Sequence, residues 1–188
     1  MENTKIKQDK KISVSTLTLI GLMTAVTCIL GPLSIPIGPV PISFTNLAIY
    51  FTVILLGWKK GTVSYLIYLL MGLVGVPVFS SFTGGPGKLF GPTGGYLIGF
   101  IFIAIISGLF VERFFGKIYM YVAGMILGTA VCYIFGTAWL AFQADISFSA
   151  ALAVGVVPFI LGDLIKIVIA VVVGPTIRKQ IVKAGFVK

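Results

Sequence analysis

Six long runs of apolar residues dominate the chain, separated by short segments rich in charge or in Gly and Pro. The runs cover residues 14–31, 42–57, 61–76, 93–111, 118–142 and 150–174. Because about 20 apolar residues in a helix cross a ~30 Å hydrocarbon core, the pattern predicts six transmembrane helices. The second and third runs are short, so we expect those helices to be upright or completed by packing. Pro158 predicts a bend in the last run.

Composition excludes an ordinary soluble domain. The 188-residue chain is 58% hydrophobic and 10% charged, and its mean hydropathy is +1.12. The spans and their connections use the whole sequence, so we expect one all-α transmembrane domain over residues 1–188. Residues 1–13 and the first run resemble a signal peptide but lack a small-x-small cleavage site. We interpret them as a cytoplasmic tail and a retained helix.

The basic residues are concentrated on one side of this six-span arrangement. Of the fourteen, twelve fall on that side, one (Lys88) falls on the other, and one (Lys166) lies inside a span. The pattern follows the positive-inside rule and predicts that both termini are cytoplasmic. It therefore accounts for the net charge of +9 without nucleic-acid binding. The twelve are Lys5, Lys7, Lys10, Lys11, Lys59, Lys60, Arg113, Lys117, Arg178, Lys179, Lys183 and Lys188.

Metal and disulfide chemistry have little support in the sequence. There is no His, and the two cysteines, Cys28 and Cys132, both lie within predicted spans. We expect each to serve as a small apolar residue, with no metal site.

Asp163 and Lys166 are the two ionisable residues inside an apolar run. A charge at the centre of a membrane helix costs about 2.5–3.5 kcal/mol on insertion scales, so such residues indicate a functional site. Their i, i+3 spacing places them on neighbouring positions of one helix face. They can pair with each other or bind one ligand together. A purely structural ion pair is the alternative.

The first predicted outer loop, residues 31–45, is apolar but cannot be helical. It contains Pro32, Pro36, Pro39 and Pro41, which favour extended or turn backbone. We expect it to fold back onto the bundle as a cap; the alternative is a loop lying in the lipid interface.

The second outer loop, residues 77–96, holds six glycines and several aromatic residues. Pro92 and Thr93 predict a helix start, where the backbone N–H groups of Gly94 and Gly95 can face an anion or a carbonyl. No Gly-Lys-Ser/Thr follows, so this is not a phosphate loop. The aromatic residues with ring faces for a ligand are Phe79, Phe82, Phe90 and Tyr96.

Small residues recur four apart within the spans, which favours close helix–helix contact in lipid. Two series predict internal packing: Gly124, Gly128, Cys132 and Gly136, and Gly91, Gly95 and Gly99. The pair Gly21 and Ala25 on the first helix flanks the charged tail and suits contact with a partner.

Three stretches together resemble the BioY family, the biotin-specific S components of energy-coupling-factor (ECF) vitamin transporters. They are Gly38-Pro-Val-Pro-Ile-Ser43, Gly91-Pro-Thr-Gly-Gly-Tyr-Leu-Ile-Gly-Phe100 and Pro158-Phe-Ile-Leu-Gly-Asp-Leu-Ile-Lys166. Residues 55–61 and 72–79 add support, so the similarity spans essentially the whole chain in order.

The resemblance implies a six-helix, substrate-binding, multi-pass protein of the bacterial cell membrane that is not an enzyme. It implies partners: a transmembrane coupling protein (T component) and two ABC ATPases, which use ATP, while this chain needs no cofactor. In the family a small-xxx-small motif on the first helix contacts the coupling protein. The match here is Gly21–Ala25, with Gly where Ala is usual.

Biotin chemistry fits the candidate residues. Asp163 is expected to accept from the ureido N–H groups and Lys166 to donate to the ureido carbonyl. Lys88, the only outer-loop cation, is the candidate for the valerate carboxylate. The apolar part of biotin is expected to lie on Phe79, Phe82, Phe90 and Tyr96, next to Thr93, Gly94 and Gly95, with the proline-rich loop as a lid.

Three alternatives remain open at this point. One is a self-sufficient solute carrier, although no broken-helix repeat supports it. Another is an S component for a different vitamin. The third is an intramembrane enzyme using Asp163 and Lys166 as acid and base, although no nucleophile motif or second carboxylate accompanies them.

Overall fold

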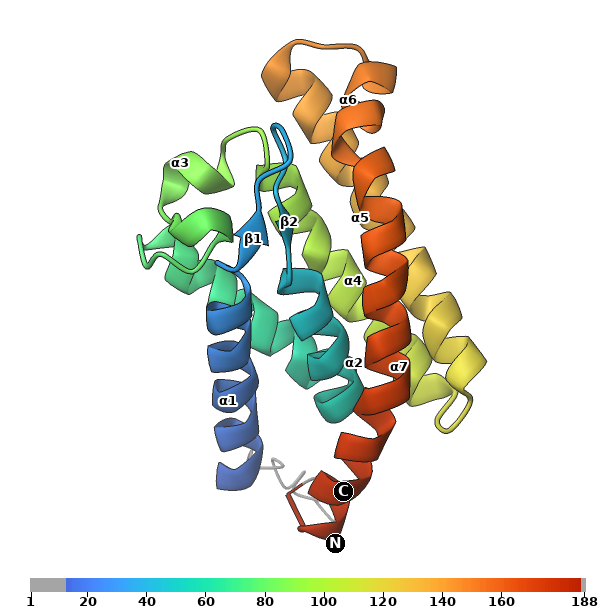
Figure 1. Cartoon of the computed structure of the whole chain (residues 1–188). Coiled ribbons are helices and arrows are strands. Elements are labelled where there is room, and N and C mark those ends of the chain that lie inside the picture. Colours follow the sequence, from blue (N-terminus) through green and yellow to red (C-terminus); the bar gives the residue numbers. More distant parts are fainter. Residues whose placement is uncertain (1–12, 187–188) are drawn as a thin grey trace, which may run out of the picture.

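Long helices run through the whole length of the molecule, and short elements gather at one end (Figure 1). The structure is a computed structural model that describes residues 13–186, so all of the predicted tail except Ser13 lies outside the described residues. The elements are α1 (Val14–Leu30), β1 (Ser34–Ile35), β2 (Ile42–Ser43), α2 (Thr45–Leu73), η1 (Ser80–Phe82), α3 (Pro86–Leu89), α4 (Gly94–Arg113), α5 (Ile118–Ala144), α6 (Phe148–Gly155), η2 (Val157–Phe159) and α7 (Ile160–Lys183).

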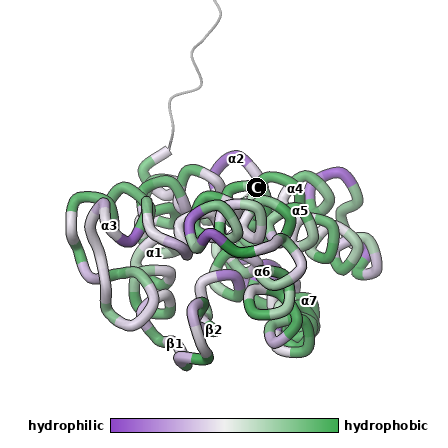
Figure 2. Tube along the Cα trace, turned by 90° about the horizontal axis from the view of Figure 1, so that it is seen from above, coloured by the Kyte–Doolittle hydropathy of each residue, from purple (hydrophilic) through white to green (hydrophobic). Residues whose placement is uncertain are grey.

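The apolar runs became helices, as predicted. Within the described part of the chain, four helical stretches are long and apolar enough to cross a membrane: α2, α4, α5 and the α6–α7 stretch; α1 is an apolar helix of 17 residues. Many large apolar side chains on these helices are exposed, and Figure 2 shows hydrophobic residues on the outward-facing sides of the bundle. Such a surface fits lipid rather than water.

The second and third predicted spans meet without a loop. Gly57 adopts φ +79° inside α2, and helix resumes directly at Trp58. A side chain at Gly57 would also collide with the Glu112 carboxylate, which accepts a hydrogen bond from the Trp58 N–H at 3.0 Å. Only Gly tolerates both the positive φ and this close approach. The expected connection over residues 57–61 is thus a single-residue kink.

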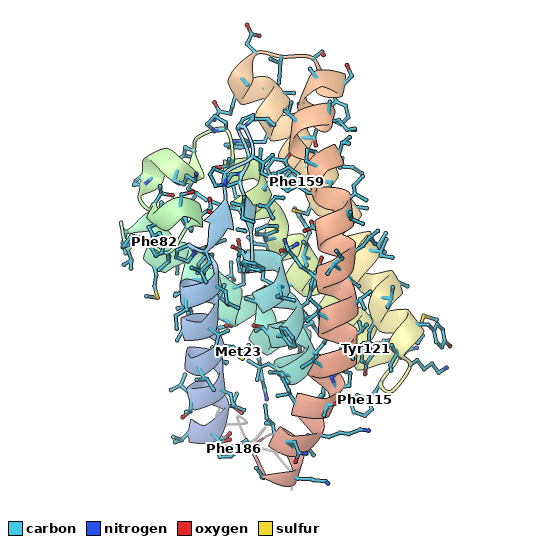
Figure 3. The ribbon with its side chains drawn as sticks, viewed as in Figure 1. Met23, Phe82, Phe115, Tyr121, Phe159 and Phe186 are labelled. Carbon is cyan, nitrogen blue, oxygen red and sulfur yellow. The ribbon has the colours of Figure 1, made fainter. Side chains whose placement is uncertain are left out.

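The last span bends where the sequence predicted. Pro158 has no N–H to donate, and the helix is interrupted between α6 and α7 by the short 3-10 turn η2. This interruption places Phe159 at the upper end of the bundle (Figure 3) and starts α7 three residues before Asp163.

Helices α4 and α5 pack closely through small residues. A side chain at Gly124 would collide with Phe110, and one at Gly136 with the ring of Tyr96. Gly99 approaches Cys132 in the same way. The predicted internal packing of both glycine series is confirmed.

The described basic residues other than Lys88 and Lys166 lie toward the end of the bundle opposite the hairpin. Lys60 approaches Thr16 at the start of α1, and the Arg178 guanidinium on α7 stacks on Phe115 of the α4–α5 turn. The hydrogen bond from Ser15 to the Phe186 carbonyl joins the start of α1 to the chain after α7. This basic end agrees with the charge split seen in the sequence.

We expect the basic end to face the cytoplasm. Single cysteines placed at Ile37, Phe82 and Asp145, in a protein with Cys28 and Cys132 replaced by Ala, should react with a membrane-impermeant maleimide added outside cells. Cysteines at Lys59 and Phe115 should react only after the membrane is permeabilised. External labelling at Lys59 would overturn this orientation.

Candidate functional site

A cavity lies beneath the β1–β2 hairpin, where the first turns of several helices meet. Its volume is about 530 Å³ including its opening to solvent. Residues from the hairpin, α2, η1, α4, α5 and the α6–α7 stretch line it. They are Val40, Pro41, Ser43, Asn46, Ser80, Thr93, Tyr96, Leu97, Phe100, Tyr133, Gly155, Phe159, Asp163 and Lys166.

The predicted pair forms a buried ion pair in the wall of this cavity. The Lys166 Nζ lies 2.9 Å from the Asp163 Oδ1, and Lys166 and Asp163 are 6% and 8% exposed. Asp163 is in the first turn of α7, where the helix dipole favours a negative charge. The two charges therefore compensate each other in an apolar setting, where either one alone would be costly.

All three N–H donors of Lys166 are in use. Besides Asp163, the ammonium donates to the Ser43 carbonyl at 2.7 Å and to the Asn46 Oδ1 at 3.0 Å. Asp163 is less occupied, because it accepts one bond from Lys166 and one from the Tyr133 hydroxyl, at 2.6 Å. A carboxylate has about four lone-pair positions, so Asp163 can accept further donors while Lys166 must exchange a partner.

The proline-rich loop caps the cavity, as predicted. It forms an antiparallel hairpin in which Ser34 pairs with Ser43. Val40 is buried toward the cavity, whereas Ile35 is exposed. The Ser34 hydroxyl accepts from the Ser81 N–H at 2.9 Å, which ties the hairpin to the second loop. The bond from Lys166 to the Ser43 carbonyl ties it to α7.

The start of α4 places some predicted residues in the cavity and others behind it. Thr93 precedes the helix, and both Thr93 and Tyr96 line the cavity. Gly94 and Gly95 do not: side chains there would collide with the Leu89 carbonyl and with Trp139. The Gly94 N–H donates to the Gly91 carbonyl at 2.9 Å, so it does not face a ligand as the sequence suggested. The two glycines position their neighbours.

Four other predicted residues lie away from the cavity. Phe79 is fully buried, edge-on to Tyr68 at 5.6 Å, and fills the space above Gly72. Phe82 and Phe90 are 66% and 59% exposed, and Figure 3 shows Phe82 on the outer side of the loop. Lys88 is half-buried in α3, and this burial lowers the pKa of its ammonium group. The first part of the loop folds on itself through a bridge between Phe79 and Thr83.

Sequence reasoning missed Ser43, Asn46 and Tyr133. Asn46 carried a usable signal, because it is an amide inside an apolar run, where polar groups need partners. For Tyr133 the signal in the sequence was weak: a buried tyrosine hydroxyl needs an acceptor, and nothing in the sequence names that acceptor. The Ser43 contribution comes from its main-chain carbonyl, which no residue type reveals.

The arrangement suits a small, mostly apolar ligand that carries N–H donors beside a carbonyl acceptor. Asp163 offers acceptor positions, and Lys166 offers a charged donor once one of its partners leaves. The rings of Tyr96, Phe100 and Phe159 supply apolar walls around this polar corner.

Comparisons with known proteins agree with one another. Residues 3–183 match the model of the BioY family. The biotin transporter BioY of Thermotoga maritima is 38% identical over 159 residues, covering 85% of this chain and 93% of that protein. Biotin transporter BioY2 of Lactococcus lactis is 34% identical over 174 residues, covering 93% and 91%. The crystal structure of the S-component for biotin from an ECF-type ABC transporter superposes with a TM-score of 0.83 at 37% identity, covering 89% and 92%.

Gly95 provides a test of how closely the cavity depends on helix packing. Replacing it with Val should push α4 away from Trp139 and displace Tyr96, lowering stability by about 1–3 kcal/mol and weakening ligand binding. Thermal unfolding in detergent and a binding titration would measure both effects. Gly87→Val is the matched control, because a side chain at Gly87 meets open space. Equal behaviour of the two variants would contradict a positioning role for Gly95.

Proposed function

The chain belongs to the BioY family, and we propose that it captures biotin in the cavity beneath the β1–β2 hairpin. It is the biotin-binding S component of an ECF-type ABC transporter, a multi-pass membrane protein and not an enzyme. The observation that carries the proposed site is the buried Asp163–Lys166 pair in the cavity wall.

Biotin's ureido ring matches the polar corner of the cavity. The ring carries two N–H donors and one carbonyl acceptor. Asp163 accepts from N–H, using lone-pair positions that Lys166 and Tyr133 leave free. Lys166 donates to the carbonyl. These charge-assisted hydrogen bonds are the stronger kind, and they discriminate against rings lacking either N–H or C=O.

Lys166 must release one acceptor to receive the ureido carbonyl. The Ser43 carbonyl is the partner that can leave with least cost, because it belongs to the hairpin while Asp163 and Asn46 belong to helices. One carbonyl then replaces another, and the number of hydrogen bonds to Lys166 is unchanged. Biotin capture is thereby linked to the position of the hairpin.

The rest of biotin is apolar except for its carboxylate. The thiophane ring and valeryl chain lie against Tyr96, Phe100 and Phe159, which line the cavity. Lys88 is the only described cation of the hairpin end besides Lys166, and it remains the candidate for the carboxylate. To reach the ligand it requires movement of α3, since it does not line the cavity.

The energising partners are a T component and two ABC ATPases. Gly21 and Ala25 are both exposed on α1, and a side chain added at Gly21 would meet no atom within 4 Å. This pair is thus free of internal packing and offers a flat surface on which a helix of the T component can approach closely.

Truncating either member of the pair tests the site. Asp163→Ala and Lys166→Ala should each weaken biotin binding by about 2–5 kcal/mol, because each leaves the other charge buried and unpaired. Isothermal titration of the purified full chain would measure the loss.

The charge-swapped variant, Asp163→Lys with Lys166→Asp, separates recognition from structure. It keeps an ion pair but places biotin's donors and acceptor opposite the wrong groups, so binding should not recover. Full recovery would mean that the pair only stabilises the fold.

The α1 surface has its own test. Gly21→Leu with Ala25→Leu should keep biotin affinity near wild type while abolishing ATP-driven uptake and copurification of the T component. The matched control is Ala123→Leu with Ala138→Leu, which enlarges two exposed small residues on α5. Normal uptake by the α1 variant would place the docking surface elsewhere.

A further inference from the structure

A second cavity, the basic-end cleft, opens at the far end of the bundle from the biotin site. Its volume is about 960 Å³ including its opening. Figure 3 shows Phe115 and Tyr121 beside the lower part of α7, where the cleft lies. The residues that line it are Ile54, Phe115, Gly116, Ile118, Tyr121, Pro175, Arg178, Lys179, Val182 and Lys183.

The cleft combines apolar walls with a cationic rim. Pro175, Arg178, Lys179, Val182 and Lys183 follow i, i+3, i+4, i+7 and i+8 spacing, so one face of α7 presents them together. Among residues 13–186, no carboxylate lies within salt-bridge distance of these three cations. The positive charge of the rim is thus uncompensated within the described chain.

Arg178 is held in place with hydrogen-bonding capacity to spare. One of its Nη1 hydrogens bonds to the Ile54 carbonyl at 2.6 Å, and its guanidinium stacks on the Phe115 ring, 4.9 Å from the centroid. Its Nε is buried without a partner among the described residues, so the N–H groups that a ligand can reach are those of the terminal nitrogens. A positioned guanidinium with free N–H groups is suited to a phosphate.

An apolar groove lies further along the same two helices. Between α5 and α7, it is lined mostly by apolar residues, and also by Thr129, Tyr133 and Asp163. The apolar ones are Ile126, Ala130, Ile160, Leu164 and Ile167. The outer surfaces beside it carry exposed Leu127 and Val168. An acyl chain leaving the basic-end cleft would therefore find apolar surface along the bundle.

We propose that the basic-end cleft binds an anionic phospholipid. Its phosphate contacts Arg178, Lys179 and Lys183, and its acyl chains lie on Ile118, Tyr121 and the α5–α7 groove. Cations in the last turns of a membrane helix lie at the depth of the headgroups, and basic pockets between such helices recognise anionic lipid. A free phosphate would contact only the cationic rim and leave the apolar walls of the cleft without a partner. A lipid contacts both the rim and the walls.

Native mass spectrometry of the full chain in detergent tests this proposal. With equal amounts of phosphatidylglycerol and phosphatidylcholine, the wild type should retain phosphatidylglycerol at least about tenfold more. Lys179→Gln with Lys183→Gln should remove most of that preference. Both side chains are exposed, so the fold should persist, and unchanged biotin binding would verify this. Adding Arg178→Gln should remove the rest.

Matched neutral variants at the same end provide the control. Lys59→Gln with Lys60→Gln removes the same charge outside the cleft and should leave the lipid preference intact. If the two double variants lost the preference for phosphatidylglycerol equally, the lipid would be attracted to the basic end as a whole and not to the cleft. That result would overturn the proposal. Displacement of the lipid by millimolar inorganic phosphate would overturn it in favour of an anion site. Equal retention of the two lipids by the wild type would show that the cations serve only the α7 dipole.

Discussion

The ion pair between Asp163 and Lys166 is the interaction on which the proposed biotin site depends. Charges inside a membrane protein persist only when they are paired and hydrogen-bonded. Here Lys166 bonds to the hairpin, to α2 and to α7, while Asp163 bonds to α5 through Tyr133. Four separate parts of the chain thus meet at one pair of charges. The same pair neutralises itself and places one acceptor and one charged donor in the cavity wall.

The rest of the fold holds these parts at fixed separations. The α4–α5 contact runs along glycines whose side-chain positions are filled by Phe110, Tyr96 and Cys132, so the helices cannot slide without collision. The break at Pro158 lets α7 begin just before Asp163, under the hairpin. At the opposite end of the bundle, α2 kinks at Gly57 without a loop, and the Glu112 carboxylate accepts a hydrogen bond from the neighbouring Trp58 N–H. Rigid packing therefore surrounds a site that a two-stranded hairpin covers.

Much of this arrangement could be predicted from residue types. The apolar runs indicated the helices, Pro158 the bend, the glycine series close internal packing, and the buried charges a pair that the structure places in the cavity wall. The directions of the loop side chains were harder to predict. A Gly-rich loop permits many backbone conformations, and the directions of its aromatic rings depend on tertiary contacts. Phe79 turned inward over Gly72, and Phe82 and Phe90 turned outward. The Gly57 kink was also missed, since a single φ value leaves no pattern in hydropathy. Ser43 acts through its main chain, and that contribution is invisible in a sequence.

The saturation of Lys166 has a consequence for the time course of binding. A ligand arriving at the empty site meets a donor whose three hydrogens are already used. In the proposed exchange the ligand waits for the Ser43 carbonyl to leave, so association should be slower than simple diffusion would allow. Departure follows the same exchange in reverse, because the Ser43 carbonyl must take the place of the ureido carbonyl on Lys166. A site built in this way exchanges its ligand slowly in both directions, and long residence follows from the lid as much as from the strength of the contacts.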